Sequence, residues 1–150
     1  MKRRFPKPRA WIPKNIEKYA GDPTKIVSRS SWELRTFKWL DENPSVLEWS
    51  SEEVVIPYKS PVDNKMHRYF PDVYARFKTS DNRTKTYLIE IKPEYQSKPP
   101  EIKKNITKRY VTEVCTYAVN DAKWRAAREY CLDRKWEFKV ITEKDLFSNG

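Results

Sequence analysis

The chain has 150 residues and a formal net charge of +10, because 31 Lys and Arg residues outnumber 21 Asp and Glu residues. Its length fits one domain, its two glycines exclude the glycine-rich loops that bind nucleotide cofactors, and its single histidine argues against Ser-His-Asp catalysis. No run of 18 apolar residues is present, so we expect neither a membrane protein nor an exported one, and the basic charge favours nucleic acid as partner.

A basic N-terminal arm is expected over residues 1–27, followed by one folded domain over residues 28–150. The first 14 residues carry six basic side chains, no acidic side chain and three prolines, which prevent a regular helix. An extended arm of this composition is suited to following nucleic-acid phosphates, and the alternative is a solvated tail with one tryptophan docked on the core. The arm residues that we predict to contact phosphates are Lys2, Arg3, Arg4, Lys7 and Arg9.

An amphipathic helix is predicted from Ser30 to Leu40. Ser30 and Glu33 have the spacing of a capping box, and apolar residues follow at helical spacing. The Asn43-Pro44 dipeptide ends this helix, because the residue before a proline disfavours helical backbone. Two short β-type runs follow, at residues 46–49 and 53–59.

Two further strands are predicted at residues 68–77 and 86–92, separated by a polar loop. So short a connection predicts an antiparallel hairpin. The expected register places Asp72 across from Ile91, and therefore between the side chains of Glu90 and Lys92 on the neighbouring strand. Several ionisable groups therefore converge in an otherwise apolar hairpin.

The chemistry of this hairpin is predicted to involve a metal ion. Glu90 and Lys92 share one face of their strand, since side chains alternate along a strand. Burying the charges of Asp72 and Glu90 is costly unless protons or cations neutralise them. A divalent metal is the natural neutraliser, because Mg²⁺ prefers carboxylate, water and phosphate oxygens. Phosphodiester hydrolysis needs such a metal and a nearby cation such as Lys92. The alternatives are that Asp72 and Glu90 face solvent, and that Lys92 lies on an edge strand, where its charge prevents pairing with other chains.

The C-terminal third is predicted to contain helices at residues 102–118 and 120–131 and a final strand at residues 136–141. The order of elements predicts an α+β (mixed α/β) fold with a central sheet flanked by helices. The segment 98–109 has a single acidic residue and is a second candidate for phosphate binding. Its predicted contact residues are Lys103, Lys104, Lys108 and Arg109.

Pro71-Asp72 and Glu90-Ile91-Lys92 resemble the PD-(D/E)xK motif of a nuclease superfamily on its two characteristic strands. Three segments are similar to the N-terminal nuclease domain of TnsA. They are the Ser-x-x-Glu helix start at Ser30, the His67-x-x-Phe70-Pro71-Asp72 sequence and the ending at residues 138–146. The whole chain resembles the head completion nucleases of T-even-like tailed phages. The resemblance implies a restriction-endonuclease-like mixed sheet, a nuclease domain over residues 28–150, and a glutamate on the preceding helix, here Glu33, that completes the site. Capping of the helix is the alternative role of Glu33.

The activity that the resemblance implies is metal-dependent hydrolysis of DNA, endonucleolytic or exonucleolytic. Asp72, Glu90 and Glu33 would bind Mg²⁺ or Mn²⁺, and Lys92 would assist the attacking water. The implied setting is phage head completion and head-tail joining after DNA packaging, in the host cytoplasm or the virion, with head or tail-joining proteins as partners. Two rival functions are a non-enzymatic DNA-binding or joining module with a nuclease fold, and an endonuclease acting on junctions or transposon ends.

Overall fold

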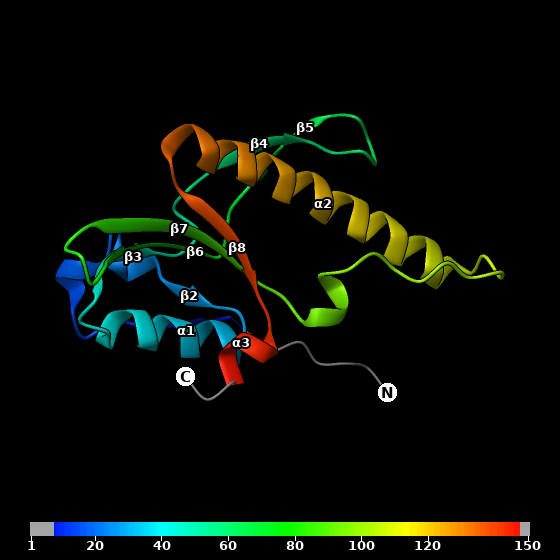
Figure 1. Ribbon diagram of the computed structural model, residues 1–150. Helices are drawn as coiled ribbons and strands as arrows, with labels where there is room; N and C mark the ends of the chain where they lie inside the picture. The colour runs from blue at the N-terminus through cyan, green and yellow to red at the C-terminus, as the bar shows by residue number, and fades with distance from the viewer. Residues whose placement is uncertain (1–7, 148–150) are drawn as a thin grey trace.

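The computed structural model describes residues 8–147, which are built around a mixed four-stranded sheet with the order β3-β6-β7-β8 (Figure 1). β6 pairs antiparallel with both β3 and β7, and β8 runs parallel to β7. The predicted α+β fold with a central mixed sheet is therefore confirmed. The strands of this sheet are β3 (Val46–Ser50), β6 (Val73–Lys78), β7 (Thr84–Ile91) and β8 (Glu137–Ile141).

Two helices, α1 (Ser31–Glu42) and α2 (Lys108–Arg134), cover opposite faces of the sheet (Figure 1). Because side chains alternate along β7, Ile89 joins the apolar cluster beneath α1, whereas Leu88 joins the cluster beneath α2. Each face of the central strand is thus buried against its own helix.

Helix α1 begins as the sequence predicts. The Ser30 hydroxyl accepts a hydrogen bond from the backbone N–H of Glu33 at 3.1 Å, as an N-cap residue does. Phe37 and Leu40 lie on the buried face of the helix, and Phe37 stacks on Trp49 with ring centroids 5.4 Å apart. This packing holds α1 against the sheet.

The predicted hairpin is confirmed, but its first strand is shorter than expected. Val73 pairs with Ile89, which displaces the register by one residue from the predicted one. The prediction of one strand over 68–77 is wrong, because β6 begins only at Val73. Residues 66–69 instead form β5 (Met66–Tyr69), which pairs with β4 (Ile56–Lys59) in a separate two-stranded sheet. Pro71 lies in the break, since proline has no N–H to donate to a ladder.

The two helices predicted between residues 102 and 131 are one helix, α2, whose N-cap is Thr107. No glycine or proline occurs between Thr107 and Arg134, so the Asn120-Asp121 pair does not interrupt the helix. Residues 102–107 contain no regular helix. β8 follows close to its predicted position, and a short helix, α3 (Glu143–Phe147), comes after it.

The described part of the N-terminal segment packs on the body of the protein. Trp11 contacts the rings of Phe37 and Trp49, with centroid distances of 6.4 and 6.2 Å. Within residues 8–147, no helix is long and apolar enough to cross a membrane. The remaining elements are β1 (Arg9–Ala10), the 3-10 helices η1 (Ile16–Lys18) and η2 (Pro23–Lys25), β2 (Val27–Ser28), and the 3-10 helix η3 (Glu94–Gln96).

Candidate active site

Asp72 lies at the entry to β6, directly after the break at Pro71. Its Oδ2 accepts a hydrogen bond of 2.8 Å from the backbone N–H of Ile91, at the end of β7. The Asp72 side chain therefore links the start of β6 to the end of β7, and this bond to the β7 backbone fixes its orientation.

Glu90 is buried on β7 beside Asp72, with 6% of its surface exposed. The Tyr69 hydroxyl donates a hydrogen bond of 2.6 Å to Glu90 Oε2, and the Lys92 Nζ lies 3.6 Å from Oε1. Lys123 of α2 lies over the Tyr69 ring, with its Nζ 5.7 Å from the centroid. The structure thus brings Glu90 and Lys92 together, as the strand alternation predicts.

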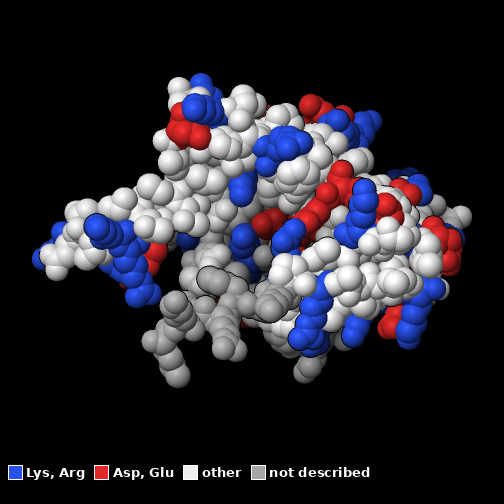
Figure 2. Space-filling view, turned by 180° about the vertical axis from the view of Figure 1, so that it is seen from behind, with Lys and Arg blue, Asp and Glu red and all other residues white. Residues whose placement is uncertain are grey.

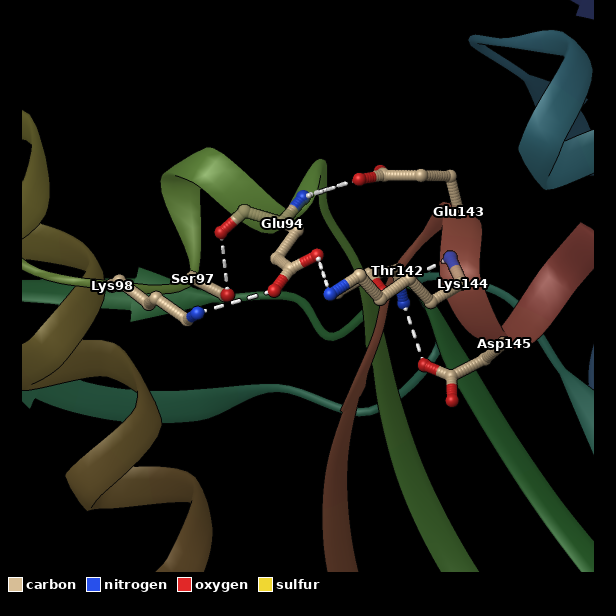
Figure 3. Close-up of polar contacts among 7 residues, drawn as sticks. All are labelled: Glu94, Ser97, Lys98, Thr142, Glu143, Lys144 and Asp145. Carbon is tan, nitrogen blue, oxygen red and sulfur yellow. Dashed lines mark hydrogen bonds and ion pairs between the residues drawn. The ribbon is translucent and has the colours of Figure 1, made fainter.

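The backbone that carries Lys92 is held by hydrogen bonds to β8 at Lys92 itself and to α3 two residues later. The Lys92 N–H donates to the Ile141 carbonyl of β8 at 3.0 Å. Just beyond it, Figure 3 shows Glu94 of η3 held by α3: the Glu94 N–H donates to Glu143, and the Glu94 carboxylate pairs with the Lys144 Nζ at 2.7 Å. The end of β7 therefore holds Lys92 in a defined position.

Glu33 reaches the same site from the first turn of α1. One carboxylate oxygen each of Glu33, Asp72 and Glu52 lies within 4.8 Å of the others. Glu33 is only 9% exposed, and its Oε1 is buried without a hydrogen-bond partner. Its backbone N–H belongs to the N-cap while its carboxylate faces Asp72, so helix capping and site formation are compatible. Glu90 is outside this group of three carboxylates.

Glu52 was missed by the sequence analysis. It follows the end of β3 in a bend, with φ of 56° in the left-handed region that non-glycine residues rarely adopt. Arg29 contacts both of its oxygens, through Nε at 2.9 Å and Nη2 at 3.3 Å. No periodic pattern marks this position, and only the place where β3 ends would have pointed to it.

Burial dominates the electrostatics of the site. It raises the pKa of Asp72 well above its usual range, and the adjacent charge of Glu90 raises it further. Burial also raises the pKa of Glu90, against the opposing effects of the Tyr69 hydrogen bond and Lys92. The pKa of Glu33 is raised for the same first reason. Ionised carboxylates at this density require a cation nearby.

The donor set fits a hard divalent cation. The side chains that converge offer carboxylate oxygens, which suit Mg²⁺ and Mn²⁺, and no thiolate or imidazole is among the clustered groups of the described chain. The unpaired Glu33 Oε1 is a buried acceptor of the kind that a metal ligand presents before its ion is bound. Glu33, Asp72 and Glu52 could therefore hold a metal ion, and the predicted ligand Glu90 lies next to this group, beside Lys92.

Acidic and basic side chains lie close together on one face of the protein. Figure 2 shows acidic side chains in a hollow near the middle of one face, with Lys and Arg side chains on both sides. Between η3 and α2, a groove of about 400 Å³ is lined by Lys98, Arg109 and Tyr117 among others. A larger cavity of about 780 Å³ lies between α1 and the sheet and contains none of the four predicted catalytic residues.

The predicted phosphate contacts occupy two separate places. Lys103, Lys104, Lys108 and Arg109 are exposed at the start of α2 and in the segment before it, which projects from the sheet (Figure 1). Arg9 is exposed on β1. Lys2, Arg3, Arg4 and Lys7 lie outside the described residues. DNA contact by any of these residues stays a prediction.

Comparison with known proteins agrees with the motif. The family model described as TnsA-like endonuclease N terminal matches residues 43–143, which include Asp72, Glu90 and Lys92. The head completion nuclease of Enterobacteria phage T4 is 41% identical over 144 residues, covering 93% of this chain and 93% of that protein. The resemblance inferred from the sequence is confirmed.

Proposed function

Because this chain belongs to the TnsA-like N-terminal endonuclease family, we propose that it is a nuclease that hydrolyses DNA phosphodiester bonds with the help of Mg²⁺ or Mn²⁺. The proposed metal ligands are Asp72, Glu90 and Glu33, and the proposed partner of the attacking water is Lys92. Phage head completion is the proposed setting, because the relative from phage T4 has that name and aligns over nearly the whole chain.

One observation carries the metal-dependent part of this proposal. Glu33 Oε1 is buried without a hydrogen bond, in a carboxylate that lies beside Asp72. Leaving a buried acceptor unpaired costs about 1–3 kcal/mol, and the Ser30 hydroxyl donates only to the other oxygen of this carboxylate, Oε2, at 3.3 Å. Glu33 Oε1 would gain its missing partner from a bound divalent cation.

The residues of the site have different proposed roles in the reaction. Ile91 N–H and Tyr69 OH orient Asp72 and Glu90, so each carboxylate keeps its position before any ligand arrives. The Lys92 ammonium, with 29% of its side chain exposed, reaches the open side of the site. There it would hold a water against the phosphate and balance the charge that develops during attack. The metal, when bound, polarises the phosphoryl oxygen.

DNA would be held by the basic surroundings of the site. Phosphate contacts from Lys and Arg position a duplex without reading its sequence, so we expect little sequence specificity. Lys103, Lys104, Lys108 and Arg109 are exposed on the part of the chain that projects from the sheet, where they can contact backbone phosphates. Head or tail-joining proteins are the proposed protein partners, and phage assembly in the host cytoplasm or the virion is the proposed location.

The test is cleavage of plasmid and linear DNA by the purified protein. We expect cleavage with Mg²⁺ or Mn²⁺, none after EDTA, and none for Asp72→Asn, while Asp133→Asn on the exposed face of α2 cleaves like the wild type. Nicked and branched substrates in the same assay compare nuclease action on junctions with action on ordinary duplex. DNA binding without cleavage under all these conditions would reject the nuclease in favour of a non-enzymatic binding or joining module.

A further inference from the structure

We propose that Glu52 is a fourth carboxylate ligand of the divalent cation, and that Arg29 occupies its carboxylate until the cation binds. This inference rests on the proposed metal dependence. It concerns a residue outside the PD-(D/E)xK motif, on the bend after β3, where the sequence gives no indication of a site.

The first argument is the placement of Glu52. Its carboxylate lies within 4.8 Å of the carboxylates of Glu33 and Asp72, so three acids from three separate elements meet at one point. A backbone in the left-handed region holds it there, although this conformation is unfavourable for a residue with a Cβ. The adjacent Glu53 has no such role, because it turns away to the Tyr19 hydroxyl and the Asp22 amide.

The second argument is the unpaired acceptor in the same cluster. Glu33 is nine-tenths buried, and its Oε1 has no hydrogen-bond partner among the described residues. A cation placed between Glu33, Asp72 and Glu52 would satisfy this oxygen. Acids gathered only by surface crowding would keep their oxygens in water.

The third argument is the pairing with Arg29. The guanidinium contacts both oxygens of Glu52, and it also lies in the field of Glu33 and Asp72. It therefore neutralises one of the three charges in this cluster. Because the Arg29 side chain is 55% exposed, it can leave Glu52 for solvent or for a DNA phosphate without disrupting the core. Arg29 and the cation would compete for the same carboxylate.

This competition predicts effects of opposite sign on Mn²⁺ affinity, measured by calorimetry and by electron paramagnetic resonance of free Mn²⁺, without DNA or turnover. Glu52→Gln should weaken Mn²⁺ binding at least about tenfold. Arg29→Met should strengthen it several-fold. The matched control, Glu53→Gln, removes the same charge from the next residue and should bind like the wild type.

The double variant Arg29→Met/Glu52→Gln decides how Arg29 acts. If it acts through Glu52, the double variant binds Mn²⁺ as weakly as Glu52→Gln alone. An equal gain from Arg29→Met in both backgrounds would show that Arg29 acts as a distant charge, and would overturn its proposed role. Unchanged affinity of Glu52→Gln would reduce Glu52 to the partner of a surface ion pair and overturn the proposal.

Two further measurements separate a failure of folding and a failure of the proposed function. Glu52→Gly removes the carboxylate at a left-handed position that glycine prefers, so the protein should stay folded, by circular dichroism, and still bind Mn²⁺ weakly. Asp72→Asn reports on the metal site as a whole. If the wild type binds no Mn²⁺, or Asp72→Asn binds as the wild type does, the proposed metal dependence fails as well; if only Asp72→Asn loses binding, the Glu52 proposal alone fails.

Discussion

The acidic hollow, which is the cluster formed by Glu33, Asp72 and Glu90, and the basic projecting segment of residues 98–109 are built in opposite ways. In the hollow, Glu90 and Glu33 are buried, and Asp72 is fixed by a backbone hydrogen bond. In the projecting segment, almost every residue is exposed, including Ile102 at 97% and Ile106 at 71%. Groups that perform chemistry need fixed geometry, whereas groups that hold a polyanion need only reach and charge. We therefore expect changes in the hollow to alter turnover and changes in the segment to alter affinity.

The largest effect is expected from Lys92→Ala. Loss of the ammonium should reduce the cleavage rate at least about 100-fold, while the Kd for DNA stays within a few-fold of the wild-type value. Single-turnover cleavage and a binding titration in Ca²⁺ measure the two quantities separately. Lys85→Ala is the matched control, since it removes a lysine from the exposed part of the same strand. A parallel loss of binding and cleavage in Lys92→Ala would contradict the separation of roles.

The converse change is the removal of four positive charges from the projecting segment. Replacing Lys103, Lys104, Lys108 and Arg109 with Gln should weaken DNA binding at least about tenfold at 0.1 M salt and flatten its salt dependence. Cleavage at saturating DNA should be unchanged. As a control that removes the same number of charges, Gln can replace Arg125, Arg128, Arg134 and Lys135, which are exposed in the second half of α2 and just after it. Equal loss from both sets would show that only net charge matters.

A smaller effect is expected from Tyr69→Phe, which removes the hydroxyl that orients Glu90. Because Glu90 is a proposed metal ligand, metal affinity and cleavage should each fall about tenfold. Because the ring remains, the two-stranded sheet should keep its stability. Tyr58→Phe, in the partner strand of the same sheet, serves as the control. Wild-type metal affinity in Tyr69→Phe would show that the sheet alone positions Glu90.

The smallest effect concerns the stability of the metal-free protein. The pKa of Asp72 is raised in the folded state, so the folded protein binds more protons than the unfolded chain at pH values above the ordinary pKa of Asp, about 3.9. Stability in EDTA should therefore fall as pH rises through the raised pKa. Asp72→Asn should remove this fall and raise the free energy of unfolding at neutral pH by about 1 kcal/mol or more. Urea denaturation across pH measures it, and a wild-type stability that rises with pH would contradict the shift.

The sequence predicted which side chains meet in the acidic hollow better than it predicted where the strands and helices begin and end. Strand alternation and a short polar loop were enough to predict the meeting of Asp72, Glu90 and Lys92, and a register error of one residue did not separate them. The capping spacing predicted where α1 begins, whereas Glu33 was expected in the site from the resemblance to the nuclease superfamily. These are local patterns, and each depends on residues close together in the chain.

Features that depend on distant contacts were not predicted. At Pro71 the chain passes from one sheet to another. The β-forming residues on both sides of Pro71 read as one continuous strand, so the sequence does not indicate this break. Glu52 enters the site only because β3 ends at Ser50 and the chain then bends. The Asn120-Asp121 pair resembles a helix start, but Asn120 is buried inside α2, where tertiary packing overrides the local preference.

The parallel pairing of β7 with β8 has a consequence for biosynthesis. Asp72, Glu90 and Lys92 leave the ribosome well before β8 and α3, whose Ile141 and Glu143 bind the backbone at the end of β7. Glu94 and Glu143 are 49 residues apart in the chain. A nascent chain that already carries every residue of the motif therefore lacks the strand that fixes it. We expect the chain to acquire a formed site only after β8 is synthesised, which delays any cleavage until β8 has paired with β7.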